Sequence, residues 1–274
     1  MSSPASVDPA DVHAALADVA SRLCALVRSI EDPAAHAIGN WNTVEVAVHV
    51  AHVWENLTAL ADDEIPSPLQ DIHALGPLTQ DLVRQDGDRI PAALADRIDV
   101  RATAFLSDAS RLHSEVRSPW LVQGITVPRV ALACHLLSES LLHGHDIARA
   151  QQVRWDITRA HAGLALMGFA FPLLSRLDPR AMVDQERARG MHARYDISLR
   201  GAGHVFMEIA DGAVTVQLKH ARSVDCHLSA DPATFLLLLF GRISQWPPTL
   251  TGRLVAWGRK PWLASKLRQV LRNP

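Results

Sequence analysis

The chain has 274 residues, of which 48% are hydrophobic and 20% charged, a composition typical of a folded globular protein and not of a disordered one. A formal net charge of −2 and a pI near 6.7 argue against nucleic acid as the main partner. The three cysteines are odd in number and lack CxxC spacing, which favours a reducing compartment over a disulfide framework.

Neither a membrane span nor a signal peptide is expected from the sequence. The longest apolar stretches, residues 235–240 and 163–174, fall short of the ~18 residues of a membrane helix, and Pro172 interrupts the second. Residues 1–12 contain no basic segment followed by an apolar run. We therefore expect a soluble cytoplasmic protein, monomeric or a small homo-oligomer, with small-molecule partners and no membrane or nucleic-acid partner.

The first part of the chain has the apolar spacing of long helices. Asp8 and Pro9 are typical of a helix start, and Asn42 followed by Glu45 fits a capping box. Helices are predicted over residues 9–30, 43–62, 78–89, 92–110 and 131–150. The third and fourth stretches are separated only near Pro91, so they form one or two helices. The chain thus has four long helices up to residue 150, which favours a four-helix bundle. A further apolar helix is predicted from about 157 to 177.

The pattern then changes to short β-rich segments. Strands are predicted over residues 193–199, 205–209, 213–218 and 224–228. An Asp-Gly pair at 211–212 indicates a hairpin between the second and third of them. An apolar helix ending near 240 and a basic amphipathic helix over 262–271 complete the chain. The predicted fold class is thus a helical bundle, residues 1–178, followed by a small α+β domain with an antiparallel sheet, residues 179–274.

The segment 131–150 carries the strongest functional signal. It places His135, Glu139 and His143 four residues apart, so that all three lie on one face of a helix whose other positions are apolar. Polar groups on a buried helix need hydrogen-bond partners or a cation, and imidazole with carboxylate suits zinc or a similar divalent ion. His49 and His52, on the helix predicted over 43–62, compete for the place of a third ligand.

Each of these residues also has a structural interpretation. Glu139 and His143 can form a hydrogen-bonded contact without a metal, and His135 can be a core histidine or a partner of Glu139. Asp146 can orient a neighbouring imidazole or pair with Arg149 on the surface. Arg242 follows a very apolar helix and suits a carboxylate-bearing ligand, which a guanidinium holds by two parallel hydrogen bonds.

Two motifs resemble the mycothiol-dependent maleylpyruvate isomerase family. The first is Trp41 followed two turns later by His49, and the second is ExxxHxxDxAxA from Glu139 to Ala150. The segments 230–242 and 250–258 look like the sterol-carrier-like C-terminal domain of that family. The resemblance implies a DinB-like metal-binding bundle with His49, Glu139 and His143 as ligands, in preference to His52. It also implies that Asp146 orders the site and that Arg242 acts on the substrate.

The resemblance further implies a divalent metal, most simply zinc, and mycothiol or a similar thiol as cosubstrate. A coordinated thiol loses its proton and can add to a small electrophile, so the expected activity is an isomerase or S-transferase acting on a small acidic substrate. Two alternatives remain open. One is a non-enzymatic carrier of a small ligand or lipid, and the other is a metal-dependent hydrolase that needs no thiol.

Overall fold

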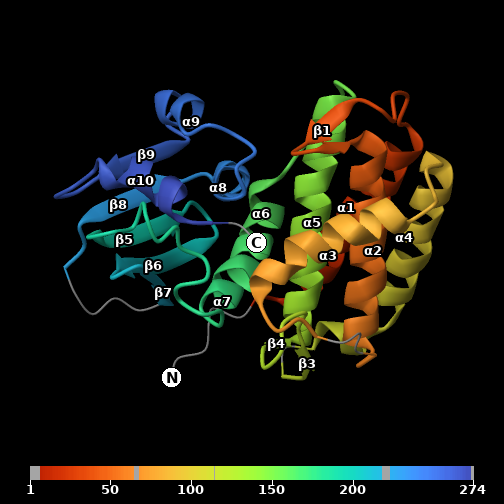
Figure 1. The fold of residues 1–274 in the computed structure, drawn as a ribbon, viewed down its shortest axis with the longest axis horizontal. Helices are drawn as coiled ribbons and strands as arrows, with labels where there is room; N and C mark the ends of the chain where they lie inside the picture. The colour runs from red at the N-terminus through yellow and green to blue at the C-terminus, as the bar shows by residue number, and fades with distance from the viewer. Residues whose placement is uncertain (1–6, 65–67, 114, 218–222, 273–274) are drawn as a thin grey trace. The chain divides into compact units, whose positions relative to one another are not determined.

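A computed structural model describes residues 7–64, 68–113, 115–217 and 223–272 (Figure 1). The chain divides into two compact units, Val7–Ile157 and the residues from Thr158 onward. The predicted boundary lay between 178 and 179. The units divide earlier because the helical stretch that begins at Arg159 packs on the strands and helices that follow it: α6 contacts α8, and Arg159 Nε lies 2.6 Å from Asp231 Oδ2.

The first unit is mainly helical. Its helices are α1 (Pro9–Arg28), α2 (Thr43–Ala61), α3 (Leu75–Gln85), α4 (Pro91–Ser107) and α5 (Arg129–Ala150), with short 3₁₀ turns at Ile72–Ala74 and Ala109–Leu112. Two small antiparallel pairs join them, β1 (His36–Ile38) with β2 (Trp41–Asn42) and β3 (Arg117–Pro119) with β4 (Thr126–Pro128). The sequence patterns predicted the long helices and missed these two pairs.

The four longest helices pack around one apolar core. Both α1 and α2 contact α4, and both contact α5. The start of α2 is fixed by the predicted capping box, because Asn42 accepts from the Glu45 backbone N–H at 3.0 Å while the Glu45 carboxylate accepts from the Asn42 N–H at 2.9 Å. Helix α5 is buried on nearly all sides, which explains its apolar composition.

Close packing near the end of α5 depends on a residue without a side chain. A Cβ atom on Gly144 would lie 2.3 Å from the Trp155 ring, so only glycine lets the indole reach this helix. Trp155 Nε1 then donates to the Leu141 carbonyl at 3.0 Å, and the Arg22 guanidinium lies 4.5 Å from the centre of the ring. The segment after α5 is thereby held against the turn that carries His143.

The second unit is an α+β structure. Its helices are α6 (Arg159–Ala165), α7 (Phe171–Leu174), α8 (Pro232–Leu239), α9 (Trp246–Leu250) and α10 (Leu263–Val270), and its strands are β5 (His192–Leu199), β6 (Gly203–Ala210), β7 (Ala213–Gln217), β8 (Cys226–Ala230) and β9 (Leu254–Trp257). A π-helical turn at Leu166–Ala170 joins α6 to α7. There Phe171 N–H bonds to Leu166 O, just before Pro172, whose ring nitrogen cannot donate.

The five strands form one sheet in the order β7-β6-β5-β8-β9. The α+β class is as predicted, but the sheet is mixed and not antiparallel, because β8 pairs in parallel with β5 at Tyr195 and Cys226. The alternating pattern predicts which residues form strands and not the direction in which a later strand returns. Strand β9 was missed, and the predicted end of the third strand at residue 218 lies outside the described residues.

One face of the sheet forms the core of this unit. Tyr195, Ile197 and Leu199 of β5 are buried at alternate positions, and the Tyr195 hydroxyl donates to Leu263 O of α10 at 3.0 Å. Across the described residues, no helix combines the length and the apolar character that a membrane span requires.

Candidate metal centre

Helix α2 presents His49 beside an indole ring. The ring centroids of Trp41 and His49 are 5.1 Å apart, and Trp41 Nε1 donates to Gln80 Oε1 of α3 at 2.8 Å, which fixes the orientation of the indole. Trp41 immediately precedes the N-cap residue of α2, so the capping box that starts the helix also fixes the distance between Trp41 and His49. The side chain of His49 is 13% exposed.

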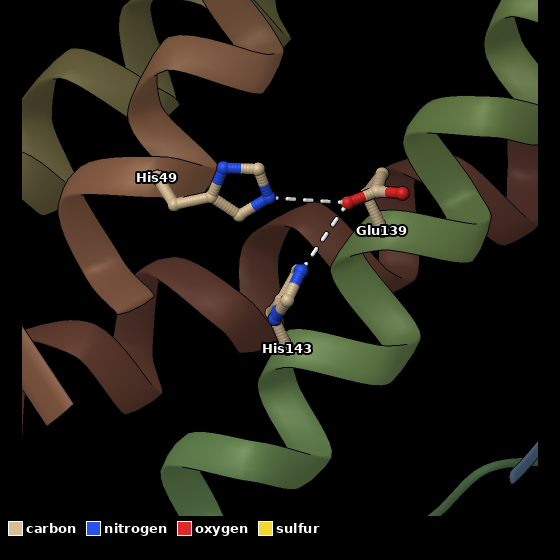
Figure 2. A group of neighbouring side chains, drawn as sticks. All are labelled: His49, Glu139 and His143. Carbon is tan, nitrogen blue, oxygen red and sulfur yellow. Dashed lines mark hydrogen bonds and ion pairs between the residues drawn. The ribbon is translucent and has the colours of Figure 1, made fainter. Parts of the chain in front are cut away.

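Helix α5 presents Glu139 and His143 on the face that meets His49 (Figure 2). Glu139 Oε2 lies 3.4 Å from His49 Nε2 and 3.3 Å from His143 Nε2. The two imidazole rings are almost perpendicular, with centroids 4.7 Å apart. Two helices, on which His49 and Glu139 lie ninety residues apart in sequence, therefore bring two histidines to one carboxylate oxygen.

These three residues have the composition of a divalent-metal site. One ligand atom from each of them lies within 4.8 Å of the other two, and this is the one group of that kind found among the described residues. Two imidazole nitrogens and a carboxylate oxygen are the ligands of many catalytic zinc sites, in which three protein ligands leave a position open for water or substrate. The donor set therefore fits the metal that the sequence predicted.

Asp146 contacts the second nitrogen of His143. Its Oδ2 lies 3.1 Å from His143 Nδ1, and the carboxylate is completely buried. A carboxylate at Nδ1 keeps a proton there and leaves Nε2 free to act as a ligand, the arrangement usual for metal-binding histidines. The contact is the one that the predicted orienting role requires, and that role stays a prediction.

The surroundings shift the pKa values of all three groups. Burial raises the pKa of Glu139, but hydrogen bonds from His135, His143 and His49 outweigh it and hold that pKa well below its usual value. Burial lowers the pKa of His49. Burial also acts to lower the pKa of His143, but hydrogen bonds to Asp146 and Glu139 outweigh it and raise that pKa. Glu139 is thus ionised and His49 neutral near neutral pH, the states in which both can bind a cation.

His52 belongs to a different network. Its Nε2 lies 2.7 Å from Asp86 Oδ2, and Arg97 bridges the same carboxylate, at 2.9 Å, to Glu55. Hydrogen bonds from the Asp88 N–H, Arg97 and His52 outweigh burial and lower the pKa of Asp86 to about 2. His52 is therefore engaged in joining α2 to α4 and to the end of α3.

His135 was not among the predicted ligands, and Trp120 was not predicted to be near the site. His135 Nε2 lies 3.5 Å from the other carboxylate oxygen of Glu139, Oε1, and Trp120 Nε1 donates to His135 Nδ1 at 3.4 Å. The spacing of His135 from Glu139 is visible in the sequence, and it allows a role as partner of Glu139. Trp120 gave no signal, because its contact arises from the loop that precedes α5.

Arg242 lies in the second unit, just after α8. The chain turns there at Gly241, with φ of +73°, and the Arg242 backbone N–H bonds to Leu237 O at 2.8 Å. Its Nη1 donates to Phe240 O at 2.9 Å, which directs the guanidinium back along its own turn. The action of Arg242 on a substrate stays a prediction.

Comparison with known proteins identifies the fold. Residues 173–272 match the SCP-2 sterol transfer family. A variant of the mycothiol-dependent maleylpyruvate isomerase is 14% identical, with 93% of this chain and 95% of that chain covered and a TM-score of 0.52. A second structure of that isomerase has the same identity and coverage, with a TM-score of 0.48. A UbiJ-SCP2 ubiquinone synthesis protein is 15% identical over 36% of this chain and 73% of its own, with a TM-score of 0.27.

At these identities the similarity describes the fold alone. The first of the three structures supports a shared fold over almost the whole chain, which is the fold that the sequence motifs indicated. No curated protein sequence matches this chain significantly.

Proposed function

Since this chain has the fold of the mycothiol-dependent maleylpyruvate isomerase and an SCP-2-like C-terminal region, we propose that it is a metal-dependent enzyme that uses a low-molecular-weight thiol. The helical unit would correspond to a DinB-like four-helix bundle. The expected reaction is isomerisation of a small electrophile or transfer of the thiol to it. The observation that carries the proposal is the convergence of His49, Glu139 and His143 from two helices on one point.

His49, Glu139 and His143 would hold the metal, most simply zinc, and Asp146 would keep His143 in the ligating tautomer. A bound divalent ion would act as a Lewis acid and lower the pKa of a thiol in its open coordination position, so that the thiol would release its proton to solvent. Glu139, already ionised, contributes the negative charge that offsets the cation. The low exposure of the site limits access of bulk water.

We also propose that Arg242 binds the carboxylate of an acidic substrate through two parallel hydrogen bonds. Replacing it by lysine keeps the charge and removes the planar pair of donors. Arg242→Lys is therefore expected to raise KM for the acidic substrate much more than it lowers kcat. An unchanged KM would show that Arg242 does not bind the substrate.

The first experiment is metal analysis of the purified protein beside a His143→Ala variant. Near-stoichiometric zinc or another divalent ion in the wild type, lost in the variant, supports the site. Cobalt substitution then tests whether the thiol binds the metal, because a thiolate bound to Co²⁺ gives a charge-transfer band. Mycothiol should produce this band, and a thioether analogue should not. If the cobalt-loaded protein shows no such band with mycothiol and cleaves an ester without added thiol, the result favours a metal-dependent hydrolase.

A second candidate function is that of a small-ligand or lipid carrier. It is favoured by the SCP-2 match and by a small, partly open apolar pocket in the second unit. Leu228, Phe235, Leu254 and Leu267 make this pocket apolar, and Arg268 places a cation in its wall. Saturable binding of a fluorescent fatty acid, unaffected by metal removal and lost in Leu267→Glu, would support this function.

A further inference from the structure

The two carboxylate oxygens of Glu139 face different partners. Oε2 is directed to His49 and His143, as Figure 2 shows, whereas Oε1 lies 3.5 Å from His135 Nε2. His135 lies one turn before Glu139 on α5 and is 7% exposed. A glutamate side chain that is free to rotate loses conformational freedom when it binds a cation, so a contact that fixes its rotation in advance lowers that cost.

Trp120 determines which nitrogen of His135 carries the proton. An indole N–H can only donate, and Trp120 Nε1 points at His135 Nδ1 at 3.4 Å. Nδ1 must therefore present its lone pair, which leaves Nε2 as the nitrogen that carries the proton. In this tautomer Nε2 is a donor and faces Glu139 Oε1, so the two contacts reinforce each other.

The loop before α5 fixes the position of Trp120. This residue follows β3 directly, and its backbone N–H bonds to Ile125 O at 2.9 Å across the β3–β4 turn. The same pair of strands is tied to the first residue of α5, because Arg129 Nε donates to Ser118 Oγ at 3.2 Å. The indole is 2% exposed. Strand pairing thus fixes the backbone of Trp120, and burial fixes its indole, so the donor N–H has a defined position.

We propose that Trp120 and His135 are positioning residues for Glu139: the indole fixes the tautomer of His135, and His135 holds Glu139 Oε1 so that Oε2 is presented to the metal. This inference rests on the proposed metal site and extends it to two residues outside the ligand set. It also explains why a third histidine on the same helix face is no ligand. To bind a metal through Nε2, His135 would have to carry its proton on Nδ1. That proton would then face the N–H of Trp120.

Three substitutions separate positioning from packing. His135→Leu removes the donor and keeps an apolar side chain. His135→Gln keeps an amide N–H near the place of the imidazole Nε2–H. Trp120→Phe keeps an aromatic ring and removes the indole donor. Trp54→Phe is the matched control, because Trp54 is fully buried in the same unit and its Nε1 has no partner among the described residues.

The measurement is the Zn²⁺ affinity of each variant, obtained by competition with a chromophoric chelator at one pH. His135→Leu is expected to weaken binding by about 10- to 100-fold, the usual effect of losing a hydrogen-bond partner of a metal ligand. His135→Gln should restore most of that loss, and Trp120→Phe should weaken binding while Trp54→Phe does not. Imidazole ¹⁵N shifts of the wild type should show His135 protonated at Nε2, and Trp120→Phe should populate the other tautomer.

Three results would overturn the inference. They are wild-type affinity in His135→Leu, equal losses in His135→Gln and His135→Leu, and a His135 protonated at Nδ1 in the wild type. Failure of the proposed metal site looks different, because the wild type then binds no Zn²⁺ or His143→Ala binds it equally well. Circular dichroism and thermal unfolding in EDTA confirm that each variant compared is folded.

Discussion

Asp146 has no exposed surface, and its Oδ2 lies 3.1 Å from Nδ1 of His143 one turn earlier on α5. The other nitrogen of that ring faces Glu139 Oε2 at 3.3 Å. His143 thus lies between two carboxylates, one that keeps a proton on Nδ1 and one that belongs to the candidate metal site. If the proposed site binds a metal, this relationship should influence both the affinity and its dependence on pH.

Asp146→Asn should weaken Zn²⁺ binding by about 10- to 100-fold, because an amide holds the Nδ1 proton without the charge that raises the basicity of Nε2. The measurement is a chelator competition titration. Asp156→Asn is the control, since Asp156 pairs with Arg154 at the surface and its side chain is 61% exposed. Equal affinities in the two variants would show that Asp146 is only a structural residue.

Metal affinity should fall as the pH falls through the raised pKa of His143. Below that pKa the metal-free ring carries protons on both nitrogens, and a metal must displace the one on Nε2. Glu139 remains ionised in this range because its pKa is held well below the usual value. A plot of log affinity against pH is therefore expected to have a slope of about one below that pKa. A flat profile would exclude His143 as a ligand.

The metal-free protein should show the opposite trend for the same residue. A raised pKa in the folded state stabilises the protein at low pH, and this contribution is lost as the pH rises through that pKa. The gain in Tm on adding Zn²⁺ should therefore increase as the pH rises through that pKa. The check is thermal unfolding with EDTA and with Zn²⁺ at pH values on both sides of it, beside His143→Ala, in which the gain should vanish.

Gly144→Ala should destabilise the fold, although alanine has a higher helix propensity than glycine. The added Cβ would lie 2.3 Å from the Trp155 ring, so the indole must move and its bond to Leu141 O at 3.0 Å is strained. A loss of about 1–3 kcal/mol in the free energy of unfolding is expected. Gly76→Ala is the matched control in α3, where nothing lies within 4 Å of the added atom and a gain of up to about 1 kcal/mol is expected. Urea unfolding distinguishes the two signs.

How much of the site was predictable depends on the distance over which each contact forms. The alignment of His135, Glu139 and His143 follows from helical periodicity alone, and the capping box from the four residues at 42–45. The choice between His49 and His52 does not follow, because residues three apart on a helix differ by only about 60° in direction. The two histidines are distinguished by Asp86, which lies 34 residues beyond His52 and forms a hydrogen bond with His52 Nε2.

Other features depend on pairing between segments. Trp120 reaches His135 through a hairpin that has three residues in each strand, too short for an alternating pattern to appear. The parallel pairing of β8 with β5 likewise depends on the path of the chain and not on the composition of either strand. Local rules therefore predicted the helix faces, and tertiary contacts decided which polar groups meet.

His52→Ala provides the sharpest test of the ligand assignment. It removes the 2.7 Å contact with Asp86 and leaves that carboxylate with the Asp88 N–H and Arg97, so the free energy of unfolding should fall by about 1–3 kcal/mol. Because the pKa of Asp86 is lowered in the folded state, its ionised carboxylate stabilises the fold above the usual aspartate pKa, and this stabilisation is lost as the pH falls toward about 2. Without His52 the pKa of Asp86 should be less depressed, so the variant should unfold at a less acidic pH. Its Zn²⁺ affinity should equal that of the wild type, whereas His49→Ala should lose the metal. The reverse result, with metal lost in His52→Ala and kept in His49→Ala, would exchange the roles of the two histidines.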